Sequence, residues 1–186
     1  TSCLKSCPTE AIRIKGGKAS IIGRRCIDCG ECIRVCPNHA KNAVTDDISV
    51  LKKHRYNIAI TTPVLYGQFG SNADPSWILS AFGSIGFDEA YDTSMSSEIV
   101  NSLADKITAE TKSKPVINSS CPAILRLIQV RFPELLDNVL GIMMPSEITA
   151  RIVKNGAIER TGLEPDQIGI TIVTPCTASA TCIKKT

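Results

Sequence analysis

The sequence lacks the marks of several protein classes. Its 186 residues contain no apolar stretch near the roughly 20 residues that cross a bilayer, and no basic start followed by the short apolar segment of a secretory signal. Aromatic residues make up only 4% of the chain. A net charge of +3, from 21 basic and 18 acidic side chains, provides no concentrated basic face for phosphates. We therefore expect one or two globular domains, with no nucleic-acid and no membrane partner.

Cysteine, in contrast, is abundant. There are nine cysteines, and six of them lie within the first 36 residues. An odd number fits a complete disulfide framework poorly, and two C-x2-C steps that share one cysteine are typical of metal sites in reducing compartments. We therefore expect a cytoplasmic protein whose cysteines bind metal.

The segment from Cys26 to Pro37 carries the strongest motif. Its cysteines at 26, 29, 32 and 36 spell C-x2-C-x2-C-x3-C-P, the bacterial ferredoxin spacing for cubane iron–sulfur clusters. In such modules three of the cysteines hold one cluster, and the fourth ligates the other cluster. A zinc site is the alternative, but it would normally show two separated cysteine pairs or cysteine together with histidine. The spacing favours [4Fe-4S] clusters.

A shorter copy of this motif lies near the N-terminus. Cys3–Pro8 matches Cys32–Pro37 at an offset of 29 residues, which indicates a duplicated half-module. By the crossed-ligand rule, one cluster is complete in this chain and the other is partial, because two of its cysteines would precede Thr1. The predicted ligands are Cys7, Cys26, Cys29 and Cys32 for the complete cluster, and Cys3 and Cys36 for the partial one.

Between the two halves, the sequence predicts a β-hairpin. Two short alternating runs, residues 11–15 and 18–22, are joined at Gly16-Gly17, which favours a two-residue turn. A polar stretch and then a basic cluster mark a joint near residue 50. We expect an α+β ferredoxin-like two-cluster module over residues 1–50, truncated at its N-terminus, and a second domain over 51–186, truncated at its C-terminus.

The second domain has the pattern of an α/β protein with a parallel, doubly wound sheet. In such sheets, ligands gather beyond the carboxyl ends of the strands. Cys121 and Cys176 each follow a predicted strand and precede a predicted helix, so we expect both to bind metal at one edge of the sheet. The alternative is that each is a small buried apolar residue, which is the commoner role of a single free cysteine. The predicted strands are 57–61, 87–91, 115–118, 139–142 and 168–173, and the predicted helices are 95–111, 122–132 and 146–161.

The order of these motifs resembles that of the [FeFe]-hydrogenases and their non-catalytic relatives, over essentially the whole chain. The resemblance implies the first lobe of an H-cluster domain. It also implies that Cys121 and Cys176 each give one thiolate to the H-cluster cubane, with two further ligands from a loop beyond Thr186. The matching segments after the two-cluster module are 61–63, 86–93, 119–122, 132–136, 144–146 and 175–178.

Several residues depart from the family pattern around the diiron subsite. The resemblance places Ser120 at the catalytic position of the proton-relay cysteine, and a serine hydroxyl titrates far above a thiol, so the relay is expected to be impaired. The diiron pocket would be lined by Pro63, Val64, Thr174 and Ser179; Thr174 and Ser179 replace a methionine and a cyanide-binding lysine, and Val64 replaces a serine. Cys182 has no counterpart among the family's cluster ligands.

These departures favour a hydrogenase-like iron–sulfur electron-transfer protein that senses redox state or hydrogen, with low or no turnover. Its partner would be a redox protein or an attached signalling domain, and the resemblance allows for an H-cluster in the full-length protein. A catalytic hydrogenase that interconverts H2 with protons and electrons, and a hydrogenase-like iron–sulfur assembly factor, are the alternatives. A plain electron carrier is disfavoured, because about 130 residues of α/β domain exceed what a ferredoxin needs. The chain by itself is expected to be inactive.

Overall fold

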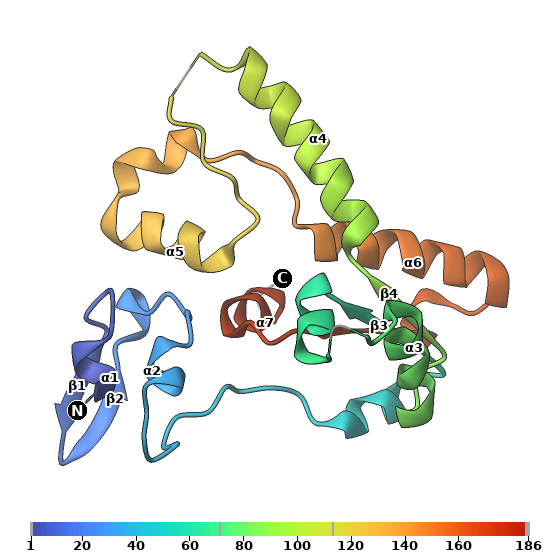
Figure 1. The fold of residues 1–186 in the computed structure, drawn as a ribbon, viewed down its shortest axis with the longest axis horizontal. Coiled ribbons are helices and arrows are strands. Elements are labelled where there is room, and N and C mark those ends of the chain that lie inside the picture. Colours follow the sequence, from blue (N-terminus) through green and yellow to red (C-terminus); the bar gives the residue numbers. More distant parts are fainter. Residues whose placement is uncertain (1, 71, 113, 185–186) are drawn as a thin grey trace. The chain divides into compact units, whose positions relative to one another are not determined.

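The computed structural model describes residues 2–70, 72–112 and 114–184, drawn as a ribbon in Figure 1. The chain forms two compact units, and each is assembled from segments that are distant in sequence. The first unit comprises Thr1–Thr45, Thr111–Gly141 and Cys176–Thr186, and the second comprises Asp46–Glu110 and Ile142–Pro175. The chain therefore passes between the units near residues 45, 110, 141 and 175.

A three-stranded parallel sheet lies at the centre of the second unit. Its strand order is β4-β3-β5, with β3 (Tyr56–Thr61) in the middle, flanked by β4 (Glu89–Asp92) and β5 (Ile168–Val173). The middle strand is apolar and rich in β-branched residues, and it is buried from Asn57 to Thr61. Burial on both faces is the usual state of a central parallel strand.

Helix α6 (Pro145–Thr161) covers one face of this sheet. Ile58 and Ile60 of β3 pack with Val153 and Ala157 of α6, and all four side chains are buried. The apolar positions of the helix are four residues apart, so they lie on one side of it. The largest core cluster of the unit is therefore the contact between β3 and α6.

The opposite face of β3 packs against a second, smaller cluster. Ala59 contacts Phe82 and Phe87, whose rings meet edge to face with centroids 5.7 Å apart. Phe82 lies in the short helical turn η4 (Ala81–Ile85), which continues directly from α3 (Pro75–Ser80). The sheet is thus enclosed by helices on both faces, in an α/β arrangement.

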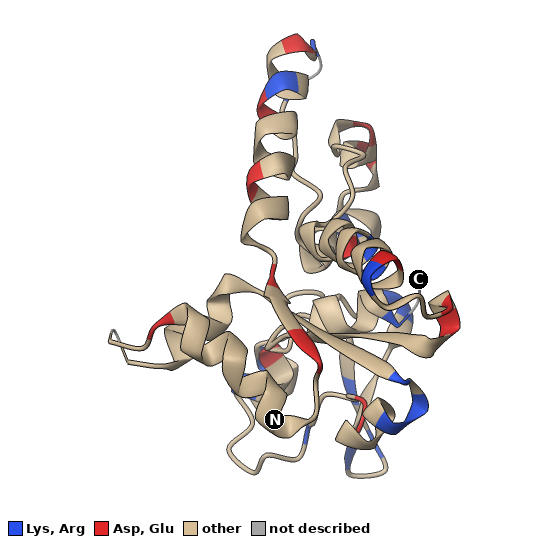
Figure 2. Cartoon of the chain, turned by 90° about the vertical axis from the view of Figure 1, so that its right-hand side faces the viewer, with Lys and Arg blue, Asp and Glu red and all other residues tan. Residues whose placement is uncertain are grey.

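Charged residues of both signs are spread along the chain (Figure 2), and one pair anchors α6 to the edge strand β4. Arg160 Nη2 donates to both carboxylate oxygens of Glu89, at 2.8 and 2.7 Å. Burial acts to raise the pKa of Glu89, but the hydrogen bonds from Arg160 and nearby tyrosines outweigh it, so the pKa lies below its usual value. The carboxylate is therefore charged at neutral pH and paired with the guanidinium.

The other helices among the described residues of the second unit are α4 (Ser94–Glu110) and three short 3-10 segments. Helix α4 contacts α6 through a buried hydrogen bond, in which the Thr149 hydroxyl donates to Ser96 Oγ at 2.7 Å. The 3-10 segments are η2 (Ile48–Lys53), η3 (Pro63–Gln68) and η6 (Pro165–Gln167). No described helix is long and apolar enough to cross a membrane.

Ile60→Ala is expected to lower the free energy of unfolding by about 2–5 kcal/mol, because it removes a fully buried side chain between β3 and α6. Ile152→Ala is the matched control: this side chain is 53% exposed on α6, and its loss is expected to cost less than about 1 kcal/mol. Urea unfolding of both variants measures the difference. Equal losses would contradict the assigned core.

The first unit begins with the predicted hairpin. β1 (Ile12–Lys15) pairs antiparallel with β2 (Lys18–Ile21), and the connecting Gly16 and Gly17 have φ angles of 53° and 74°. Positive φ at both turn residues suits glycine and matches the twist of a tight hairpin. The other elements are α1 (Ser2–Lys5), η1 (Gly23–Arg25), α2 (Glu31–Arg34), α5 (Pro122–Arg131), η5 (Pro133–Asn138) and α7 (Thr177–Ile183).

Two predicted strands are wrong. Residues 115–118 and 139–142 do not join the parallel sheet, and Ile117 and Val139 form only an isolated parallel bridge in the first unit. Pro115 has no N–H to offer a ladder, and its carbonyl accepts a hydrogen bond from the Asn138 side chain at 2.8 Å. Pairing therefore stops after one residue, and the sheet is smaller than the sequence suggests.

Candidate metal centre

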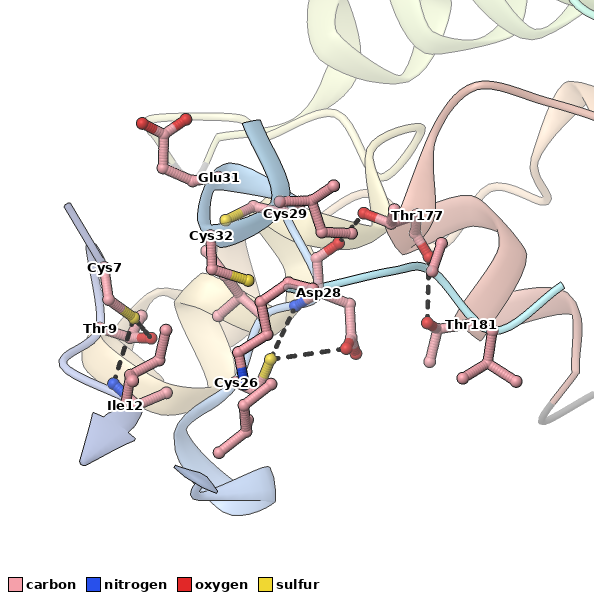
Figure 3. A pocket seen from close by; sticks show the side chains of 18 of the residues that line it. Cys7, Thr9, Ile12, Cys26, Asp28, Cys29, Glu31, Cys32, Thr177 and Thr181 are labelled. Atoms are coloured by element: carbon pink, nitrogen blue, oxygen red, sulfur yellow. Dashed lines mark hydrogen bonds between the residues drawn. The ribbon is translucent and has the colours of Figure 1, made fainter. Parts of the chain in front are cut away.

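Four cysteines line one cavity of about 370 Å³ in the first unit (Figure 3). They are the four that the sequence predicts as ligands of the complete cluster: Cys7, Cys26, Cys29 and Cys32. Among the described residues that line the cavity, neither Cys3 nor Cys36 is present. No three His, Cys, Asp or Glu side chains in the described ranges are grouped tightly enough to hold a single metal ion. The cavity thus brings together the four cysteines of the predicted complete cluster, while ligation itself stays a prediction.

The loop that carries three of these cysteines has an unusual backbone. Asp28 and Gly30 lie between the cysteines and have φ angles of 54° and 76°, in the left-handed region. Glycine adopts this region freely, and aspartate tolerates it better than most residues. The Gly30 carbonyl accepts the N–H of Ile33 at 2.9 Å, which starts α2 and places Cys32 in its first turn. The motif therefore contains two left-handed residues immediately before α2 begins.

Backbone N–H groups point at two of the cavity sulfurs. The N–H of Ala11 donates to Cys7 Sγ at 3.2 Å, and that of Asp28 donates to Cys26 Sγ at 3.4 Å. Burial acts to raise the pKa of Cys7, but the backbone hydrogen bonds outweigh it and the pKa is lowered. For Cys26, burial is the dominant cause and the pKa is raised. All four cysteines are free of disulfides, and donors aimed at sulfur suit thiolates that bind iron.

The two half-motifs have matching local structure. A backbone N–H four residues after the cysteine donates to its sulfur in each half: Ala11 to Cys7 at 3.2 Å, and Ala40 to Cys36 at 3.3 Å. The residue before each donor has a left-handed backbone; these residues are Glu10, with φ of 52°, and His39, with φ of 47°. The sequence repeat at an offset of 29 is therefore also a structural repeat.

The other two predicted cysteine ligands lie at helix N-termini of the same unit. Cys121 is the residue before α5 and Cys176 is the residue before α7, both are exposed, and the two helices pack against each other. Cys176 follows β5 as expected. Cys121 follows no strand of the sheet, because Ile117 makes only one bridge, so the expected meeting at one sheet edge is wrong in that respect. A convergence of the two sulfurs through α5 and α7 stays a prediction.

Ser179 is placed beside Cys176. Burial acts to raise the pKa of Cys176, but hydrogen bonds with the Ser179 side chain and backbone outweigh it, so the pKa is lowered. A lowered pKa favours the thiolate that binds metal. Of the predicted pocket residues, Ser179 thus has a direct contact with a predicted ligand.

Ser120 is held by its own loop. Its hydroxyl donates to Asn118 Oδ1 at 2.6 Å, and its N–H donates to the same oxygen at 2.8 Å. An amide oxygen is not a base at neutral pH, so this hydrogen bond gives the hydroxyl proton no titrating partner. The geometry fixes the side chain without activating it.

The remaining predicted pocket residues belong to the second unit. Pro63 and Val64 begin η3, which follows β3 after Thr62, and the Val64 side chain is 60% exposed. Thr174 directly follows β5. All three residues therefore follow carboxyl ends of parallel strands, where ligands of α/β proteins gather.

Sequence reasoning missed one wall of the cysteine cavity. This wall consists of Thr177, Ala180 and Thr181, which lie at helical spacing in α7, and of Lys184, which directly follows the helix. The sequence could not predict this wall, because nothing in residues 177–184 indicates which segment they contact. The loop 41–44 and Thr9 also line the cavity and were not predicted.

Comparison with known proteins decides the family. Residues 55–185 match the family described as "Iron only hydrogenase large subunit, C-terminal domain", which is more than half of the chain. The chain belongs to the iron-only hydrogenase family. Residues 1–41 of this family member also match a "4Fe-4S dicluster domain", which supports iron–sulfur cofactors.

Two curated hydrogenases are similar to this family member. The "NADP-reducing hydrogenase subunit HndD" of Solidesulfovibrio fructosivorans is 24% identical over 174 residues, which is 82% of the chain and 30% of that protein. "Iron hydrogenase 1" of Clostridium pasteurianum is 26% identical over 105 residues, which is 54% of the chain and 18% of that protein. The chain therefore spans less than a third of either relative.

Solved [FeFe]-hydrogenases share the fold. A structure from a study of oxygen inactivation and H-cluster degradation matches with a TM-score of 0.54 and 21% identity, over 72% of the chain and 39% of that structure. A HydA structure from a study of stepwise H-cluster assembly matches with a TM-score of 0.51 and 22% identity, over 74% and 37% respectively. At this identity, the likeness establishes the fold alone.

Proposed function

We propose that the chain belongs to a hydrogenase-like iron–sulfur protein that senses redox state or hydrogen and turns hydrogen over slowly or not at all. The observation that carries this proposal is Ser120. The family's relay position holds a hydroxyl, and that hydroxyl is bound to an amide oxygen 2.6 Å away. A thiol titrates near neutral pH and a serine does not, so proton delivery is expected to be slow.

In this proposal the cysteine cavity holds a [4Fe-4S] cluster through Cys7, Cys26, Cys29 and Cys32. A bound cubane supplies one-electron transfer. The chain's own residues bind it with thiolates and direct backbone N–H groups at sulfur. Ile12 and Ile27 line the cavity and are only 2% and 6% exposed, so they keep water from that side. Cys3 and Cys36 would serve a second cluster, completed by cysteines outside this chain.

The substitutions around the predicted diiron pocket point the same way. Ser179 stands where the family has a cationic lysine, and its side chain hydrogen-bonds Cys176 instead. A neutral residue cannot supply the charge-assisted hydrogen bond that a lysine gives an anionic ligand. Thr174 lacks the thioether of the family's methionine, and Val64 lacks the hydroxyl of the family's serine. The pocket is thus expected to hold a diiron subsite less firmly than that of a typical hydrogenase.

The proposal extends to organisation and partners. We propose a two-cluster module over residues 1–50 and the H-cluster lobe over 51–186, in a cytoplasmic protein that exchanges electrons with a redox partner or an attached signalling domain. Helices α5 and α7 of the proposed lobe group with the N-terminal module in the first compact unit.

Two alternatives share the same family. A catalytic hydrogenase would turn over hydrogen at a rate ordinary for the family, and an assembly factor would carry iron–sulfur clusters without a diiron subsite. Infrared spectroscopy of the full-length, matured protein distinguishes an assembly factor from the other two functions, because the cyanide ligands of a diiron subsite absorb in a region free of protein bands. We expect those bands to be present. Their absence from a protein with intact cubanes would favour the assembly factor.

A further inference from the structure

Helix α7 connects two predicted metal sites. Cys176, a predicted H-cluster ligand, directly precedes the helix, and one side of the helix closes the cysteine cavity of the other site. Cys176 and the residues that line this cavity all belong to the first unit. Thr177, the first residue of the helix, hydrogen-bonds to the cysteine loop.

The Thr177 hydroxyl donates to the backbone carbonyl of Asp28, at 2.5 Å and across 149 positions of sequence (Figure 3). Asp28 lies between Cys26 and Cys29, and it is the non-glycine residue of this loop with a left-handed backbone. Such a conformation persists only where surrounding contacts hold it. The hydrogen bond therefore acts on the part of the loop that sets the spacing of two predicted ligands.

The same hydroxyl also limits which residue can follow Cys29. A Cβ added to Gly30 would lie 2.9 Å from Thr177 Oγ1 and 3.5 Å from its Cγ2. The approach is closer than a side chain normally allows, so glycine is needed for contact with α7 as well as for its φ of 76°. Thr177 thus contacts the loop at two residues, Asp28 and Gly30, on either side of Cys29.

We propose that Thr177 is a positioning residue for the [4Fe-4S] cluster of Cys7, Cys26, Cys29 and Cys32. Its hydroxyl holds the Asp28 carbonyl, and its side chain closes the cavity above Gly30. The inference rests on the proposed cluster and goes beyond it, because neither the cysteine motif nor the family match assigns a role to Thr177 in that cluster. It makes retention of the cluster depend on the segment that carries Cys176.

Thr177→Val tests the hydrogen bond, because valine keeps the shape and removes the donor. After anaerobic reconstitution of the full chain, we expect a chelator to release iron from this variant about 5- to 10-fold faster than from the wild type, the effect of one lost hydrogen bond. Thr177→Ser restores the hydroxyl and is expected to restore slow release. Thr181→Val is the matched control, since Thr181 lines the same cavity but its hydroxyl donates to Thr177 O within the helix.

A mutant cycle tests the steric contact independently. Gly30→Ala should speed iron release, and Thr177→Ala should reduce that effect by removing the atoms that the new Cβ meets. Additive effects of the two substitutions would contradict the contact.

The outcomes separate this inference from the proposed function. A wild-type chain that takes up no cubane would overturn both. A wild-type chain that holds the cubane, with a Thr177→Val variant that retains iron equally long, would overturn the inference alone. Equal acceleration in Thr177→Val and Thr181→Val, without rescue by Thr177→Ser, would likewise assign the effect to general loosening of α7.

Discussion

Cys29→Ala is expected to abolish the [4Fe-4S] cluster of the cysteine cavity. A cubane held by four thiolates loses one iron ligand, and no histidine is present among the described residues of the cavity wall to replace it. Cys29 is exposed, so the substitution removes little packing and the fold is expected to survive. Iron and sulfide analysis, visible absorbance and electron paramagnetic resonance of the reduced chain measure the loss.

Cys182→Ala is the control for this experiment. Cys182 lies in α7, and the predicted ligand sets do not include it. Its substitution is expected to leave the iron content of the cavity cluster at the wild-type level. A wild-type chain that binds zinc and shows no iron–sulfur absorbance would contradict the assignment, as would a Cys29→Ala variant with undiminished cluster signals.

Ser120→Cys is expected to raise hydrogen turnover of the matured, full-length protein. The substitution replaces a hydroxyl that titrates far above neutral pH with a thiol that titrates near it, in a loop that Asn118 already fixes. General acid–base groups are typically worth about 10²- to 10⁴-fold in rate. The full gain is expected in a background with Ser179→Lys and Thr174→Met, which restores the family's residues at both pocket positions.

Ser120→Thr provides the comparison. Threonine keeps a hydroxyl and adds a methyl group, so it tests whether any change at this exposed position alters the rate. We expect no gain from it. If Ser120→Cys in the restored background is no faster than the restored background alone, proton delivery at residue 120 does not limit turnover and the relay argument is wrong.

Local pattern was sufficient for most of the second unit. The β-branched run before Thr61 predicts β3, and amphipathic spacing predicts α4 and α6 to within one residue at either end. The strand predicted at residues 115–118 is wrong, because their apolar character fits a strand while Pro115 and the Asn138 side chain interrupt the pairing. Hydrophobic periodicity indicates which side chains are buried, but it does not indicate which backbone groups find a hydrogen-bond partner.

The composition of the compact units was not predictable in the same way. Residues 111–141 group with the N-terminal segment, although an intervening sheet separates them in sequence. Such grouping depends on packing between distant helices, as for α5 and α7, and leaves no local pattern.

The candidate site shows the same division. Cysteine spacing, the repeat at an offset of 29 residues and the crossed-ligand rule together selected the four cysteines that line the cavity. Thr177 was missed, since its contact with Asp28 spans 149 positions and a hydroxyl on a helix is usually solvated. Spacing can identify ligands that are near in sequence, whereas the residues that hold them in place come from elsewhere in the chain.

Hydrogen turnover of the matured, full-length protein tests the central claim most directly. The rate is measured beside that of a typical [FeFe]-hydrogenase, under the same reductant and pH, after infrared spectroscopy has verified the diiron subsite. Because the relay position lacks its thiol, we expect a rate about 10²- to 10⁴-fold below that of the reference enzyme. A rate equal to that of the reference would contradict the sensor and establish a catalytic hydrogenase in its place.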